Sequence, residues 1–181
     1  MSRFELTILG CNSAMPAYDR FPTSQVLDIH DQLILIDCGE GTQIRMNQYK
    51  IKRNRINHIF ISHLHGDHVY GLAGLLTSYN HHSRSADLHI HGPEGLEDMI
   101  TTQLRYTGNP LNYNLHFHQV GTDQSEQLLE TDHFEVRSIP LTHRIPTCGY
   151  LFTEVLEARH LLPDKLEEYG IPTEYYEQIK K

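Results

Sequence analysis

Four side chains that can bind a metal ion follow directly on a short apolar run in the first half of the sequence. The run Ile59-Phe60-Ile61 is β-branched and aromatic and is too short for a helix, so it predicts a buried β-strand. The potential ligands occupy the loop at the end of this strand, at His63, His65, Asp67 and His68. The sequence therefore predicts a buried strand with candidate metal ligands on the loop at its end.

The rest of the chain alternates between strand-like and helix-like segments. Strands are predicted where apolar runs lie between turn residues, at residues 4–9, 24–29, 33–36, 88–91, 112–120 and 134–141. His30-Asp31-Gln32 joins the second and third of these as a predicted hairpin. Helices are predicted at residues 42–49, with Thr42 as a candidate N-cap, and at 69–79 and 94–104. The polar segment 121–133 is predicted as a loop or an edge strand, and the whole pattern indicates an α/β fold.

The charge balance of the sequence bears on what the protein can bind. It carries 15 basic and 23 acidic residues, which gives a formal net charge of −8. General nucleic-acid binding favours the opposite sign, so an RNA partner requires a local basic patch. The densest positive run comprises Lys50, Lys52, Arg53 and Arg55, with Arg45 nearby. The simpler interpretation of such a run is a solvated face or loop, and composition leaves both open.

Length and cysteine usage place the chain among ordinary globular proteins. At 181 residues it is long enough for one domain with a core, or for part of a larger one. Cys11, Cys38 and Cys148 are an odd number without paired spacing, so no disulfide framework is predicted. No apolar stretch approaches the roughly 20 residues of a membrane span. We therefore expect a cytoplasmic protein with no membrane partner.

The 14 histidines of the sequence do not all indicate metal binding. His89 and His91, and likewise His116 and His118, are two residues apart, which in a strand places both rings on one face. Neither pair is followed by a carboxylate or by a turn that would bring further donors to the same point. These four are therefore interpreted as strand-surface residues rather than ligands.

The loop that carries His63, His65, Asp67 and His68 suits a pair of zinc ions. Zinc binds imidazole nitrogen and carboxylate oxygen, and a catalytic site keeps one position open for water. Four donors on a six-residue loop cannot all face one ion without backbone strain, so His63 and His65 would bind one ion and Asp67 and His68 another. Two such ions activate water and neutralise charge on an ester oxygen, which favours hydrolysis. The alternatives are a chance group of histidines and a closed structural zinc site, which more often uses cysteine.

Several motifs resemble those of one protein family. Ser62-His63-Leu64-His65-Gly66-Asp67-His68 is similar to the signature of the metallo-β-lactamase fold superfamily. Other stretches resemble its ribonuclease Z branch, the tRNA 3′-processing endonucleases, in the same order along the chain. They are Leu35-Ile36-Asp37-Cys38-Gly39-Glu40-Gly41-Thr42-Gln43, His68-Val69-Tyr70-Gly71-Leu72, and Pro140-Leu141-Thr142-His143 followed by Cys148-Gly149-Tyr150. The likeness extends from about Phe4 to Lys181.

The resemblance implies an architecture and partners. The expected fold is the αβ/βα sandwich of that superfamily, of which residues 1–155 would form the N-terminal part. Residues 156–181 would begin an arm that grips tRNA, although the expected Gly-Pro-rich turn reads Ile171-Pro172-Thr173 here. The family also implies a homodimer that acts on precursor tRNA, with residues 10–20 as a loop facing the substrate.

The resemblance also implies roles for individual residues. His63, His65 and His143 would bind one zinc ion, and Asp67 and His68 would bind the other. Asp67 would in addition orient the attacking water as general base. In the family, a bridging aspartate, a final histidine ligand and a proton-donating histidine come from the sequence that follows. The chain is therefore expected to be the N-terminal portion, to bind fewer than two zinc ions and to lack turnover alone.

The function expected from these observations is zinc-dependent removal of the 3′ trailer from precursor tRNA. The products would be a tRNA 3′-hydroxyl and a trailer with a 5′-phosphate. One alternative keeps the metal chemistry and changes the substrate to a smaller phosphodiester or another ester. A second alternative is a non-catalytic remnant that only binds metal or RNA. Salt-dependent affinity for tRNA distinguishes the tRNA endonuclease from the hydrolase of smaller esters, because electrostatic contacts to phosphates weaken with salt.

Overall fold

The apolar run before the loop with the candidate ligands His63, His65, Asp67 and His68, here called the metal loop, forms strand β4 (Ile56–Phe60), in the interior of a sheet. The computed structural model describes residues 3–15, 17–108, 110–155 and 161–180. Within these residues the larger sheet has six strands in the order β1-β2-β3-β4-β5-β6, antiparallel from β1 to β3 and parallel from β3 to β6. The other strands are β1 (Phe4–Gly10), β2 (Ser24–Ile29), β3 (Gln32–Cys38), β5 (Leu88–Gly92) and β6 (Leu115–Gln119).

The predicted hairpin between β2 and β3 is confirmed. His30 and Asp31 connect the strands and have positive φ values of 48° and 61°. A two-residue turn with both residues in the left-handed region matches the twist of an antiparallel pair. The hairpin thus fixes the register in which β3 enters the sheet beside β4.

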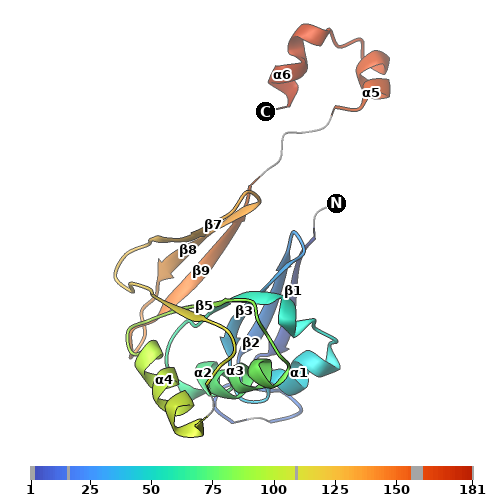
Figure 1. Ribbon diagram of the computed structural model, residues 1–181. Helices are drawn as coiled ribbons and strands as arrows, with labels where there is room; N and C mark the ends of the chain where they lie inside the picture. Colours follow the sequence, from blue (N-terminus) through green and yellow to red (C-terminus); the bar gives the residue numbers. More distant parts are fainter. Residues whose placement is uncertain (1–2, 16, 109, 156–160, 181) are drawn as a thin grey trace.

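Helices cover one face of the larger sheet (Figure 1). They are α1 (Thr42–Gln48), the 3₁₀ turn η1 (Arg53–Arg55), α2 (Gly66–Val69), α3 (Leu72–His81) and α4 (Leu96–Thr107). The core on this face joins strand residues such as Leu35 and Ile59 to Leu72 and Leu76 of α3, all fully buried. Burial of each such side chain stabilises the fold by about 1.5 to 3 kcal/mol. The helical layer therefore holds β4 and its loop against a packed core.

The helix predicted at residues 69–79 is wrong in one respect, since two helices occupy this region. Helix α2 ends at Val69, and α3 starts at Leu72. Between them the backbone N–H of Gly71 donates to the Cys38 carbonyl at 2.9 Å. A Cβ at Gly71 would meet the carbonyl oxygen of Gly39, so only glycine allows this approach. Contact with the end of β3 thus separates the two helices.

The N-cap predicted for α1 is also wrong. Gly41, with φ of 80°, precedes the helix, and Thr42 is its first residue. The Thr42 hydroxyl donates instead to the Gly39 carbonyl at 2.7 Å. A glycine in the left-handed region is favoured here because no Cβ resists that conformation.

A smaller antiparallel sheet packs on the other face of the larger one. Within the described residues it has three strands, β7 (Gln127–Glu130), β8 (Phe134–Pro140) and β9 (Cys148–Glu154), in that order. Phe134 and Val136 of β8 pack with Ile34 and Phe60 of the larger sheet. The edge strand predicted within residues 121–133 is confirmed as β7, whereas β9 was not predicted. The described layers are therefore helices, a mixed sheet and an antiparallel sheet, as the α/β prediction requires.

The C-terminal segment is helical. It contains α5 (Pro163–Glu168), η2 (Thr173–Tyr175) and α6 (Tyr176–Ile179), which Figure 1 draws away from the two sheets. Residues 156–160, where the predicted C-terminal arm begins, lie outside the described residues. No described helix combines the length and the apolar composition that crossing a bilayer requires.

Candidate metal centre

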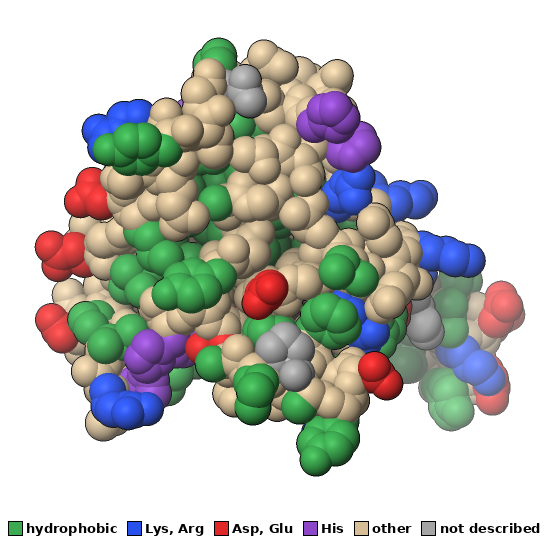
Figure 2. All heavy atoms as spheres, turned by 90° about the horizontal axis from the view of Figure 1, so that it is seen from below, with side chains coloured by type: hydrophobic (Ala, Val, Ile, Leu, Met, Phe, Trp, Pro, Cys, Tyr) green, Lys and Arg blue, Asp and Glu red, His purple; other side chains and the backbone are tan. Residues whose placement is uncertain are grey.

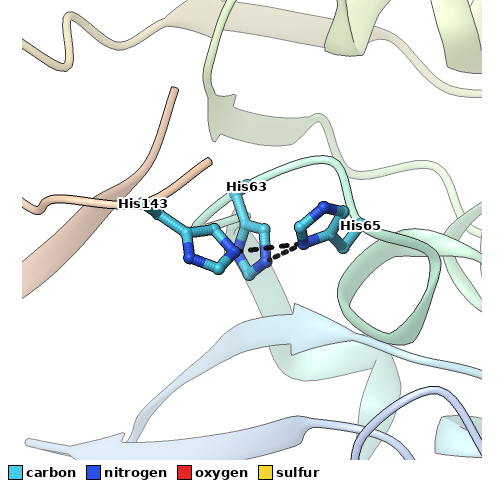
Figure 3. A group of neighbouring side chains, drawn as sticks. All are labelled: His63, His65 and His143. Atoms are coloured by element: carbon cyan, nitrogen blue, oxygen red, sulfur yellow. Dashed lines mark hydrogen bonds between the residues drawn. The ribbon is translucent and has the colours of Figure 1, made fainter. Parts of the chain in front are cut away.

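Three histidines from two parts of the chain converge at one edge of the larger sheet. His63 and His65 lie on the loop after β4, and His143 lies on the loop between β8 and β9. One ring nitrogen from each lies within 4.8 Å of the others. His65 Nδ1 is 3.1 Å from His63 Nε2 and 3.2 Å from His143 Nε2 (Figure 3). The three rings thus offer nitrogen donors to a common point.

Contacts between the two sheets bring His143 to this point. The Cys148 N–H at the start of β9 donates to the Ser62 carbonyl at 3.1 Å. The Tyr150 hydroxyl donates to the Ile61 carbonyl at 2.6 Å. Both acceptors lie in the short stretch between β4 and His63. The smaller sheet is therefore attached to the larger one immediately beside the metal loop.

Asp67 and His68 lie in the first turn of α2, next to this group but outside it. His68 Nε2 is 3.6 Å from Asp67 Oδ2, and the ring centroids of His68 and His63 are 4.0 Å apart. Among the described residues, the group with converging donor atoms contains only His63, His65 and His143. The expected second pair of ligands is thus adjacent, and its binding of an ion stays a prediction.

Asp37 was not predicted from the sequence as a site residue, and it organises the loop. Its Oδ1 accepts from the Ser62 N–H at 2.8 Å, and its Oδ2 accepts from the Ser62 hydroxyl at 3.0 Å and from His68 Nδ1 at 2.7 Å. Strands β3 and β4 are parallel neighbours, so the end of β3 lies beside the start of the metal loop. Asp37 also has a positive φ of 56°, which is uncommon outside glycine. In the sequence, Asp37 is marked only by its position at the end of a predicted strand and within a stretch that resembles the family.

The hydrogen bond to Asp37 determines how His68 presents its ring. A carboxylate accepts, so Nδ1 of His68 carries the proton and Nε2 keeps its lone pair for a metal. Burial lowers the pKa of His68, but the hydrogen bond and charge of Asp37, with the charge of Asp67, outweigh it and raise the pKa overall. Such a carboxylate partner is the usual way to orient an imidazole ligand.

His63 is kept neutral by its surroundings. Burial, followed by the nearby rings of His68, His65 and His143, lowers the pKa of His63 to about 4. Its Nδ1 lies 3.0 Å from the Ser62 hydroxyl, and its Nε2 faces His65. A metal binds the neutral imidazole, so this environment favours ligation near neutral pH.

The donor set fits zinc or a similar divalent transition metal. Imidazole nitrogen suits zinc, copper, iron and nickel, and three converging protein donors leave room for water at a catalytic site. The two buried thiols are not suitable ligands. Burial raises the pKa of Cys38 to about 12 and also raises that of Cys148, so both stay protonated.

The histidine pairs on β5 and β6 lie elsewhere, on a ladder with His58 of β4. Rings of His91 and His118 stack at 4.5 Å, and those of His89 and His116 at 4.8 Å. None of them belongs to the converging group of the described residues. The prediction that each pair shares a face is confirmed, but His91 is only 2% exposed and is not a surface residue.

Comparison with known proteins identifies a matching family model and relatives of similar sequence. The family model described as Anti-Pycsar protein Apyc1 matches residues 4–162. Ribonuclease Z of Bacteroides fragilis is 45% identical over 180 residues, which cover 99% of this chain and 59% of that protein. This chain thus spans about three fifths of the length of the curated relatives it matches.

Solved structures give the same likeness. Human tRNase Z, short form, superposes with a TM-score of 0.75 and 34% identity, over 82% of this chain and 63% of that one. The metallo-beta-lactamase fold protein YhfI from Bacillus subtilis gives a TM-score of 0.63 at 19% identity, over 82% of this chain and 56% of that one. At that identity the second likeness concerns the fold alone.

Proposed function

Because the chain belongs to the family described as Anti-Pycsar protein Apyc1, has the metallo-β-lactamase fold and is a homologue of ribonuclease Z, we propose that it is a metal-dependent endoribonuclease of precursor tRNA. The observation that carries the proposal is the convergence of His63, His65 and His143 within 4.8 Å in a chain with this relationship. The reaction would release the 3′ trailer and leave a tRNA 3′-hydroxyl and a 5′-phosphate on the trailer.

The proposed metal is zinc, with His63, His65 and His143 as the ligands of one ion. Asp67 and His68 would contribute to a second ion, and Asp37 would hold His68 in the tautomer that ligation needs. Bound zinc lowers the pKa of water towards about 7 and neutralises charge on a phosphodiester oxygen.

Asp67 is the proposed general base. Its side chain is 16% exposed, so water reaches it, and its Oδ2 lies 3.6 Å from His68 Nε2. As a carboxylate it can orient the attacking water and accept its proton. The attack on phosphorus then displaces the 3′-oxygen of the tRNA, which takes up a proton from solvent and leaves as the 3′-hydroxyl. Such a base must lie within hydrogen-bonding reach of that water.

The other partners remain part of the proposal. Residues 161–180, which form α5, η2 and α6, would belong to the arm that contacts tRNA, and two copies of the chain would form a homodimer. The loop at residues 10–20 would face the substrate. We place the reaction in the cytoplasm, in keeping with the three cysteines, which are all free thiols.

Zinc binding and tRNA cleavage test the proposal together. We expect zinc to bind through the three histidines, and we expect His65→Ala to weaken the zinc affinity at least tenfold. Competition with a chromophoric chelator measures this affinity. His82→Ala, an exposed histidine at the end of α3, is the matched control. Cleavage of 3′-extended tRNA is measured in the same samples, and the Bacteroides fragilis enzyme is the positive control. Equal zinc affinity in His65→Ala and the unaltered chain would contradict the assigned ligands.

A second candidate keeps the metal site and changes the substrate to a small phosphodiester. It is favoured by the matching family model, whose description is not that of a ribonuclease. His65-dependent hydrolysis of bis(p-nitrophenyl) phosphate, without binding or cleavage of 3′-extended tRNA, would support this candidate over the first.

A further inference from the structure

A stretch of the chain beside the larger sheet concentrates positive charge. Residues 41–66 contain five of the 15 basic residues and no acidic residue, in a protein whose net charge is −8. Four of the five are Lys50, Lys52, Arg53 and Arg55, here called the basic cluster. They lie between the end of α1 and the start of β4, in and around η1.

The basic cluster borders a hollow at the surface. A cavity of about 250 Å³ is lined by Lys50, Lys52 and Arg55 together with Arg3 and the exposed ring of Tyr49. Seen from the helical side, Lys and Arg side chains gather along the right-hand edge of the molecule (Figure 2). A hollow with several cations and one exposed aromatic ring suits a phosphate group with its neighbouring base.

The charges of the basic cluster are not neutralised by the residues that the structure describes. The side-chain ammonium groups of Lys50 and Lys52 form no hydrogen bond or ion pair with another described residue. Arg53 donates to the Asn47 side-chain oxygen at 2.9 Å, and Arg55 donates to the Asp31 backbone carbonyl. No carboxylate of the described residues pairs with any of the four.

Arg3 differs from the basic cluster in this respect. Its guanidinium lies 3.1 Å from Asp28 and 3.6 Å from Glu5, the acidic side chains that line the same cavity. Those two carboxylates therefore pair with Arg3 and form no ion pair with the basic cluster.

The backbone that carries the basic cluster is anchored to the core. The Ile51 N–H donates to the Met46 carbonyl at 2.8 Å, and the buried Tyr79 hydroxyl donates to the Arg53 carbonyl at 2.9 Å. Lys50 adopts a left-handed φ of 56°, which is held by its N–H bond to Asn47 at 3.1 Å. Anchored cations lose less freedom on binding than those on a mobile loop.

The basic cluster is far from the metal centre along the strands. It lies at the amino ends of β3 and β4, near Leu33 and Ile56, whereas Asp37 and His63 lie at their carboxyl ends. Five to seven residues at about 3.3 Å each separate the two sites by roughly 16 to 23 Å. A ligand that reaches both must be an extended polyanion.

We propose that the basic cluster is a second RNA contact, which binds backbone phosphates of the substrate remote from the scissile bond. This inference rests on the proposed function, because it takes RNA as the polyanion. It explains how an acidic protein attracts RNA, since only the docking face must be positive. Contacts of this kind position a substrate without reading its sequence.

The test measures the affinity of the chain for 3′-extended tRNA at several salt concentrations. Each lost phosphate contact lowers the slope of log affinity against log salt by about one. We therefore expect Lys50→Gln/Lys52→Gln to lower the slope by about two and to weaken binding at low salt at least tenfold. Zinc affinity should not change, which also shows that the variant is folded.

Arg105→Gln/Arg137→Gln is the control with the same change in charge. Arg105 lies on α4 and Arg137 on β8, away from the basic cluster. Equal slopes in both double variants would overturn the inference while RNA binding itself stands. Absence of tRNA binding by the unaltered chain would overturn it too, as would binding to phosphatidylserine vesicles instead of tRNA. The proposed function is judged separately, by cleavage and by the His65→Ala result.

Discussion

At the scale of single residues, Asp37 determines what the metal loop can do. One carboxylate accepts from Ser62 and His68 at once, and so sets the backbone of the loop and the tautomer of one candidate ligand. Its side chain is only 6% exposed, so water does not compete for these bonds. A buried carboxylate is stable as an anion only with such partners.

Replacing Asp37 with Asn tests this role directly. Asn tolerates the left-handed φ and keeps an acceptor for Ser62, but its amide nitrogen would face His68 Nδ1 as a donor. We expect the proton of His68 to move to Nε2, which ¹⁵N NMR at alkaline pH detects from the ring-nitrogen shifts. Metal affinity at His68 should fall by about 10- to 100-fold. Asp28→Asn is the control, and an unchanged tautomer in Asp37→Asn would refute the role.

The sequence predicted part of this site for a physical reason. His63, His65, Asp67 and His68 are close in sequence, so spacing alone places them on one loop. Asp37 comes from another strand, and its contact depends on the parallel pairing of β3 with β4, which no local pattern reveals. His143 was expected only from a family resemblance, because no local signal connects it to a loop 78 residues away.

At the scale of elements, the junction of α2 and α3 shows how closely the helical layer approaches the sheet. A Cβ at Gly71 would meet the Gly39 and Cys38 carbonyl oxygens. Gly74, one turn later in α3, has its nearest neighbour at 3.4 Å, the flexible end of Gln43. Periodicity predicted one helix here, because it cannot detect a backbone contact that interrupts a helix.

The two glycines give opposite predictions. Gly71→Ala should destabilise the protein by about 1 to 3 kcal/mol, because backbone oxygens cannot move aside. Gly74→Ala should be neutral or stabilise it by up to about 1 kcal/mol, because alanine favours a helix interior. Urea unfolding measures both free energies. Equal stability of the two variants would show that the contact at Gly71 is not rigid.

At the scale of the whole molecule, the histidine ladder links stability to pH. Burial, followed by the neighbouring rings, lowers the pKa of His58 to about 4 and that of His91 to about 3. His89 and His118 also have lowered pKa values, and Phe60 stacks on His91 at 4.3 Å. An unfolded histidine titrates near pH 6.5, so the unfolded state binds more protons below that pH. The stability from neutral, stacked rings is therefore complete above pH 6.5 and is lost as pH falls towards 4.

His91→Phe separates this contribution from that of the carboxylates. Phenylalanine keeps the stack with Phe60 and His118 and has no proton to bind. Between pH 6.5 and pH 4 we expect the variant to lose about 1 to 3 kcal/mol less of its unfolding free energy than the unaltered chain. Unfolding in urea at both pH values provides the comparison, with His82→Gln as an exposed control. If both proteins lost the same unfolding free energy, protonation of His91 would not contribute to the loss of stability in acid.

Most of the fold was predictable at this scale, with specific exceptions. Strands β1 to β6 and β8 follow apolar runs between turn residues, and those runs are visible in the sequence. Strand β9 was not predicted, although Tyr150, Phe152 and Thr153 favour strands; its pairing with β8 defines it. The stacking of two sheets depends on contacts such as Phe60 with Phe152, which are distant in sequence.

Because His143 lies on the loop between two strands of the smaller sheet, the candidate centre connects the two sheets. An ion held by His65 and His143 would clip together segments 78 residues apart, much as a disulfide closes a loop. Ion binding would then stabilise the packing of one sheet on the other, and this packing would in turn raise the affinity for the ion. Bound metal would therefore stabilise the packing of the two sheets, in addition to being required for catalysis.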